Sequence, residues 1–149
     1  MEECIFCKIV RGELPHAVIW EDEDFLAILD AFPNTRGMTL VITKKHYDSY
    51  IFDMPAATYS KYLLVTRNVA QLLEKGLKVQ RVGMVMEGMG INHAHIKLYP
   101  MHGLDKKFVE MWANERVFFE KYEGFLETKP GEKADMEELK KLAQEIKNN

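Results

Sequence analysis

The stretch INHAHIKLYP, residues 91–100, places two histidines and a lysine on alternate positions. Residues two apart in a β-strand lie on the same face of the sheet. His93, His95 and Lys97 therefore share one face, and small or apolar residues alternate with them on the other. The pattern predicts a strand with one face in the core and one face available for chemistry.

The polar face of this strand admits three interpretations. A neutral histidine ring can ligate a metal, or it can act as a nucleophile and form a covalent intermediate. A positive charge from Lys97 on the same face suits an anionic substrate such as a phosphate. The third interpretation is purely structural: two buried histidines beside a solvated lysine would give the same pattern.

The only cysteines of the chain, Cys4 and Cys7, have C-x-x-C spacing. This spacing occurs in zinc sites and in redox dithiols, and the redox motif usually opens a helix after a strand. Here the pair precedes every predicted strand, which favours a metal. Two cysteines supply half of a zinc site, and histidine is the obvious source of the other half.

Composition limits the class of protein. The chain has 149 residues, 47% of them apolar, and a net charge of −3, which suggests one domain with a substantial core. It has no basic stripe of the kind that binds nucleic acid and no apolar run of membrane-spanning length. Its first residues lack the profile of a signal peptide, so we expect a cytoplasmic protein.

The hydrophobic pattern predicts an α+β domain. Two strands with a turn at 21–24 lie within 17–32, a third strand is 38–45, and a hairpin joins 81–87 to 93–99. A long helix over 54–75 is expected to begin at an Asp53 cap and to end at Gly76. Asp135 is a candidate cap for a C-terminal helix.

Four ordered stretches resemble the histidine triad (HIT) superfamily of nucleotidyl hydrolases and transferases: CIFCKIVRGELP, VIWEDEDFLAILDAFPNTRG, TLVITKKH and HAHIKLYP. The resemblance covers residues 4 to about 100. It implies the HIT-like fold, an antiparallel sheet with one long helix and a C-terminal helix. We expect a HIT-like domain over 1–104 and an extension over 105–149 packed on the same domain. Trp112, Phe118 and Phe119 of that extension are expected to extend the core.

The resemblance also implies roles for single residues. His95 matches the nucleophile that takes up a nucleotidyl group. Lys97 has no counterpart in the family, and its role in holding phosphate charge is expected from the positive charge of lysine alone. A structural Zn²⁺ would be bound by Cys4, Cys7, His46 and His93. Asp30 matches the residue that binds the ribose hydroxyls. The base would lie beside Leu29, with Ile19 and Ala31, and the phosphate beside Asn92 and the turn containing Gly88 and Gly90.

The sequence departs from the family at the third signature position, where Lys97 stands in place of histidine or glutamine. Met38 and Thr43 replace the usual histidine and proline, and the loop before the signature has no hydroxyl group. We expect an enzyme acting at the α-phosphate of purine nucleotide phosphoramidates or dinucleoside polyphosphates. The alternative is a nucleotide-binding protein of the same fold with little catalysis. A homodimer is expected in either case.

Overall fold

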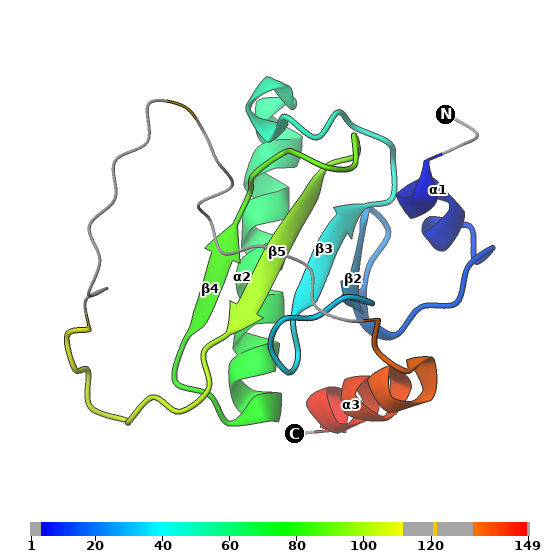
Figure 1. Ribbon diagram of the computed structural model, residues 1–149. Helices are drawn as coiled ribbons and strands as arrows, with labels where there is room; N and C mark the ends of the chain where they lie inside the picture. Colours follow the sequence, from blue (N-terminus) through cyan, green and yellow to red (C-terminus); the bar gives the residue numbers. More distant parts are fainter. Residues whose placement is uncertain (1–3, 112–120, 122–132, 149) are drawn as a thin grey trace.

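The protein, described here as a computed structural model, is an α+β domain built on one antiparallel sheet (Figure 1). The structure describes residues 4–111, 121 and 133–148. Its five strands lie in the order β1-β2-β3-β5-β4. The elements are α1 (Ile5–Val10), β1 (Val18–Glu21), β2 (Phe25–Leu29), β3 (Thr39–Thr43), the 3₁₀ helix η1 (Ile51–Asp53), α2 (Ala56–Leu77), β4 (Val82–Val85), β5 (His95–Pro100) and α3 (Met136–Asn148).

The predicted meander of the first three strands is confirmed. Between β1 and β2 the carboxylate of Asp22 accepts hydrogen bonds from the backbone N–H groups of Asp24 at 2.8 Å and Phe25 at 2.7 Å. A side chain that bonds its own backbone in this way closes a tight turn. Every residue of β2 and of β3 is buried, so these strands have no solvated face.

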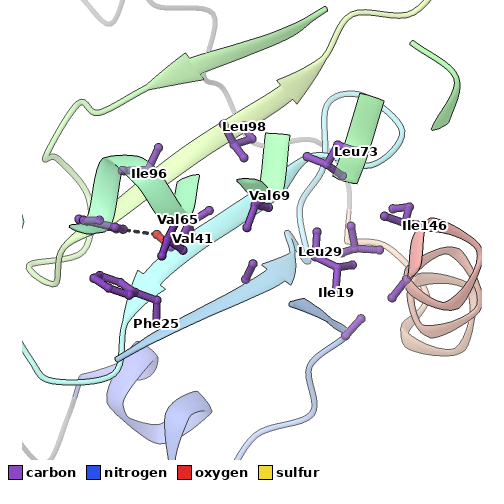
Figure 2. Close-up of a cluster of buried hydrophobic side chains, with 14 of the residues drawn as sticks. Ile19, Phe25, Leu29, Val41, Val65, Val69, Leu73, Ile96, Leu98 and Ile146 are labelled. Atoms are coloured by element: carbon purple, nitrogen blue, oxygen red, sulfur yellow. Dashed lines mark hydrogen bonds between the residues drawn. The ribbon is translucent and has the colours of Figure 1, made fainter. Parts of the chain in front are cut away.

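The sheet has a core on each face. On one face α2 and α3 cover the larger core (Figures 1 and 2), which includes Val41, Ile96 and Leu98. On the other face the smaller core joins Phe6 of α1 to alternate residues of β2 and β3: Leu26, Ile28, Leu40 and Ile42. The helix α1 therefore lies on the sheet face that α2 leaves open.

Strand β5 lies between β3 and β4, and its side chains alternate as predicted. Ile96 and Leu98 point into the core beneath α2. The strand begins at His95, which pairs with Ile42, and Lys97 pairs with Leu40 on one side and Val85 on the other. His93 was expected within the strand but precedes it, because the N–H of the intervening Ala94 bonds Tyr47 O at 2.9 Å outside the ladder.

The long helix α2 differs from its predicted bounds at both ends. Asp53 does not cap it, because Asp53 belongs to η1 and the cap residue is Pro55, which makes no side-chain cap bond. Gly76 does not end it, because the helix continues to Leu77 and stops where Lys78 takes the left-handed conformation, with φ of 56°. Leu73, in contrast, is fully buried as its helical spacing predicts.

The C-terminal helix α3 is capped as predicted. The carboxylate of Asp135 accepts the N–H groups of Glu137 and Glu138, each at 3.0 Å. Leu139, Ala143 and Ile146 are buried in the larger core, where α3 packs on α2 and β1. The aromatic residues Trp112, Phe118 and Phe119 lie outside the described residues. None of the described helices has an apolar stretch of the length that a bilayer requires.

Gly76 is a contact residue, and its replacement tests how α3 packs. A Cβ at Gly76 would lie 2.6 Å from the Cα of Ile146 and 2.7 Å from its carbonyl oxygen. Glycine to alanine in a helix normally stabilises by about 0.5–1 kcal/mol, whereas overpacking costs about 1–3 kcal/mol. We expect Gly76→Ala to lower the thermal midpoint of unfolding. The exposed α2 substitution Gln71→Ala is the control, and a midpoint raised by Gly76→Ala would contradict this packing.

Candidate functional site

Four side chains from distant parts of the chain converge on one point. Cys4, Cys7, His46 and His93 place one ligand atom each so that all four lie within 4.8 Å of one another. The Sγ of Cys4 is 3.4 Å from Nδ1 of His93, and the Sγ of Cys7 is 3.3 Å from Nδ1 of His46. In a tetrahedral zinc site, Zn–S and Zn–N bond lengths give S–N separations of about 3.6 Å. The cluster therefore has the size of a Cys₂His₂ site.

The donor chemistry of His93 also fits a metal. Its Nε2–H donates a hydrogen bond to the carbonyl oxygen of Thr43 at 2.7 Å, so the lone pair lies on Nδ1, which faces the sulfurs. Ligating histidines usually have such a partner on the other ring nitrogen. Burial lowers the pKa of His93, which favours the neutral ring that a metal needs.

The Cys7 thiol lies where its ionised form needs a nearby cation. Burial raises the pKa of Cys7, and a hydrogen bond and charge from Cys4 raise it further. Without a metal both effects favour the protonated thiol, whereas a bound metal requires the thiolate, so binding would release a proton. Among the described residues this is the only cluster of its kind.

The two cysteines belong to α1, a helix that the sequence pattern did not predict. Cys4 is the cap residue and Cys7 lies in the first turn. Residues three apart share one face of a helix, so the C-x-x-C spacing directs both thiols toward the same point. His46 follows β3 and His93 precedes β5. The cluster therefore ties α1 to two neighbouring strands of the sheet.

A cavity of about 270 Å³ opens beside this cluster, between α1 and the sheet. Its polar groups are His16, Asp30, His95 and Lys97. The remaining lining is largely apolar and includes Ile5, Phe6 and Ile9 of α1, Ile28 and Leu40 of the sheet, Met38 just before β3, Ile91 and Met136. An apolar cavity with a few converging polar groups is the usual form of a small-molecule site.

His95 presents a lone pair from a fixed ring. Its Nδ1–H donates a hydrogen bond to the carbonyl oxygen of His93 at 2.7 Å, which leaves Nε2 as the unprotonated nitrogen. Burial lowers the pKa of His95, and the positive charge of Lys97 lowers it further. The Phe6 ring packs against His95 and His93, at centroid distances of 5.4 and 5.6 Å. This neutral, oriented imidazole can act as a nucleophile.

Lys97 has an acidic partner that the sequence did not indicate. Its ammonium lies 3.9 Å from a carboxylate oxygen of Glu87, with 18% and 13% of the two side chains exposed. Val85 pairs with Lys97 across β4 and β5, and Glu87 lies two residues beyond Val85. Residues two apart in a strand share a face, so the β4–β5 register places Glu87 on the same face as Lys97. The sequence alone does not give this register.

Some of the residues predicted to bind a nucleotide face the cavity, and others lie in the core or in a neighbouring loop. Asp30 and Gly90 line the cavity, and Asp30 accepts the N–H of Phe32 at 2.8 Å. Leu29 borders the cavity but packs in the core beneath α2, whereas its neighbour Ile28 belongs to the smaller core on the cavity's face. The complete burial of β2 explains why alternation alone did not identify Ile28.

The four remaining predicted contacts also differ, and Gly88 is not among the lining residues. Ala31 lines the cavity and Ile19 is buried in the larger core. Asn92 is not among the lining residues. Its side chain accepts the N–H of Ser49 at 3.0 Å and donates to Asp48 at 3.3 Å, so it braces the loop that carries Gly90.

The chain belongs to the HIT family. The HIT domain model matches residues 11–106, more than half of the chain. An uncharacterized HIT-like protein of Methanocaldococcus jannaschii is 34% identical over 118 residues, covering 76% of this chain and 91% of that protein. An adenylylsulfatase of Arabidopsis thaliana is 32% identical over 77% of this chain, which spans 58% of that protein.

Two solved structures are similar to this fold. A hypothetical histidine triad nucleotide-binding protein from Sulfolobus tokodaii has a TM-score of 0.70 and 27% identity, with 97% of this chain and 93% of that chain covered. A zinc-bound histidine triad family protein from Mycobacterium smegmatis has a TM-score of 0.68 and 25% identity, with 99% and 92% covered. The family assignment made from the four sequence stretches is thus confirmed.

The cluster predicts one zinc ion for each chain. We expect Cys7→Ser to lose the ion, because a tetrahedral site that lacks one thiolate binds zinc far more weakly. Elemental analysis of protein desalted at neutral pH measures the ratio. The control is His95→Ala, which removes a neighbouring imidazole outside the cluster and should keep the ion. Wild-type protein that holds no stoichiometric zinc after incubation with it would contradict the assignment.

Proposed function

We propose that this protein is a nucleotidyl hydrolase or transferase in which His95 attacks the α-phosphorus of a purine nucleotide derivative. One observation carries the proposal: a neutral imidazole with its Nδ1–H bound to a backbone carbonyl borders an apolar cavity that also contains Asp30 and Lys97. Membership of the HIT family supports nucleotide chemistry at the level of the class. The name adenylylsulfatase, given to one relative, is consistent with a nucleotidyl substrate.

The proposed reaction has two steps. In the first, the Nε2 lone pair of His95 forms a bond to the α-phosphorus, and the bond from phosphorus to the leaving group breaks. The leaving group departs with that electron pair and takes a proton from solvent. In the second, the oxygen of water or of another hydroxyl acceptor attacks phosphorus and loses its proton to solvent, while the P–Nε2 bond breaks and its electron pair returns to Nε2. The nucleotide is released and His95 is again neutral.

The other cavity groups would position the substrate. The ammonium of Lys97 would attract the phosphoryl oxygens, as a cation does where negative charge develops. The Asp30 carboxylate would accept hydrogen bonds from the ribose hydroxyls, with Gly90 near the phosphate. The apolar wall of α1 would cover the base. We propose phosphoramidates and dinucleoside polyphosphates of purine nucleosides as the substrates.

The metal would have a structural role in this scheme. Cys4, Cys7, His46 and His93 supply the four ligands that a closed tetrahedral zinc site uses, so zinc would crosslink the chain and provide no open position for water. The transfer steps then rest on His95 and its neighbours alone. A homodimer and a cytoplasmic location stay predictions.

A second candidate function is nucleotide binding with little catalysis. It is favoured by the Lys97–Glu87 pair, in which a carboxylate at 3.9 Å offsets the charge available to a phosphate. Lysine also releases a proton less readily than imidazole near neutral pH. This candidate predicts nucleotide affinity without a covalent adduct.

A nucleotidyl adduct on His95 separates the two candidates. We expect intact-protein mass spectrometry to detect the adduct after brief mixing of the zinc-loaded protein with adenosine 5′-phosphoramidate. The quench must avoid acid, because a phosphorus–nitrogen bond is acid-labile. His95→Ala should remove both the adduct and turnover, because the attacking nitrogen is gone.

The exposed His102, which does not line the cavity, provides the matched control: His102→Ala should form the adduct as wild type does. Turnover near the wild-type rate in His95→Ala would refute the mechanism. Binding of AMP by wild type without adduct or turnover would instead support the binding-protein candidate.

A further inference from the structure

His16 is a polar group of the cavity to which the proposed reaction gives no task. It lies just before β1, is half-buried, and lines the same cavity as Asp30 and His95. Its Nδ1 is 2.8 Å from the carbonyl oxygen of Leu14. Pro15, which separates these two residues, has a fixed φ and so limits the freedom of this turn.

The hydrogen bond to Leu14 determines what the other ring nitrogen can do. A carbonyl oxygen only accepts hydrogen bonds, so Nδ1 carries the proton of the neutral ring. Nε2 then presents a lone pair, and it has no hydrogen-bond partner within the described part of the chain. His16 is therefore a fixed acceptor at the wall of a largely apolar cavity.

The sheet register places this acceptor next to the proposed ribose site. Val18 pairs with Ile28, and the N–H of Leu29 donates to Ala17 O at 2.9 Å. His16 precedes Ala17 and Asp30 follows Leu29, so the two residues lie just beyond the paired ends of β1 and β2. A base attached to a ribose held by Asp30 would thus lie within the part of the cavity that His16 borders, opposite the apolar side chains of α1.

We propose that His16 accepts a hydrogen bond from the exocyclic amino group of the bound nucleobase and so selects adenine over hypoxanthine. The inference rests on the proposed function and adds a residue that determines specificity. The adenine amino group is a donor that matches the Nε2 lone pair. The hypoxanthine oxygen is an acceptor, and two acceptors that face each other in an apolar cavity leave both unpaired.

The test compares the binding of two nucleotides that differ only in this amino group: AMP and purine riboside 5′-monophosphate, which has hydrogen in its place. Titration calorimetry at about pH 8 keeps histidine neutral in general. Wild type should bind AMP more tightly. His16→Phe keeps a ring of similar shape without the acceptor, so AMP affinity should fall by roughly three- to tenfold. Affinity for the nucleotide without the amino group should stay unchanged.

Two further variants distinguish loss of the hydrogen-bond acceptor from other effects of the substitution. His16→Gln restores an acceptor and should recover the preference for AMP, which also keeps the test open if His16→Phe folds poorly. His102→Phe changes an exposed histidine outside the cavity and should affect neither nucleotide.

Equal losses for both nucleotides in His16→Phe would show that His16 only packs against the ligand, and unchanged AMP affinity would show that it does not contact the base. Either result overturns the inference and leaves the proposed function intact. If wild type binds neither nucleotide, the proposed function fails and the inference fails with it.

Discussion

The site depends on the attachment of one short helix to the sheet. A six-residue helix is too short to be stable alone, and burial of Phe6, its one buried side chain, contributes only about 1.5–3 kcal/mol. A structural zinc contributes about 10–16 kcal/mol of apparent binding free energy. If Cys4 and Cys7 ligate zinc, that ligation would be the largest available force that holds α1 where Ile5, Phe6 and Ile9 form a wall of the cavity.

Backbone carbonyls give the two signature histidines different tasks. The carbonyl of Thr43 accepts a hydrogen bond from Nε2–H of His93, so the lone pair of Nδ1 could ligate a metal. The carbonyl of His93 accepts a hydrogen bond from Nδ1–H of His95, so Nε2 carries the lone pair that the proposed reaction uses. Each ring thus has a defined tautomer and a fixed orientation before any ligand binds, which reduces the reorganisation that binding requires. His16, which also lines the cavity, repeats the arrangement through the hydrogen bond from its Nδ1–H to Leu14 O.

The sequence predicted the features that arise from local patterns. Alternation identified β5, the turn residue Asp22 lay in the predicted turn, and Asp135 was recognised as a cap. It missed features that arise from contacts between distant segments. Propensity does not reveal α1, a six-residue helix that contacts the sheet through Phe6 and through the side chains of the Cys/His cluster. The sequence pattern predicts that the helix ends at Gly76. In the structure the helix continues past it, and the glycine makes room for the backbone of Ile146. Glu87 reaches Lys97 only through the β4–β5 register.

The most direct test is whether zinc binding and nucleotide binding are thermodynamically coupled. AMP affinity should be measured on zinc-loaded protein and on protein whose zinc has been removed by a chelator, with circular dichroism to verify that the sheet persists. If the cluster holds the α1 wall in place, affinity for AMP falls at least about tenfold without zinc, and AMP tightens zinc binding by the same factor. Equal AMP affinity with and without zinc would contradict the account, since the cavity would then form without the metal.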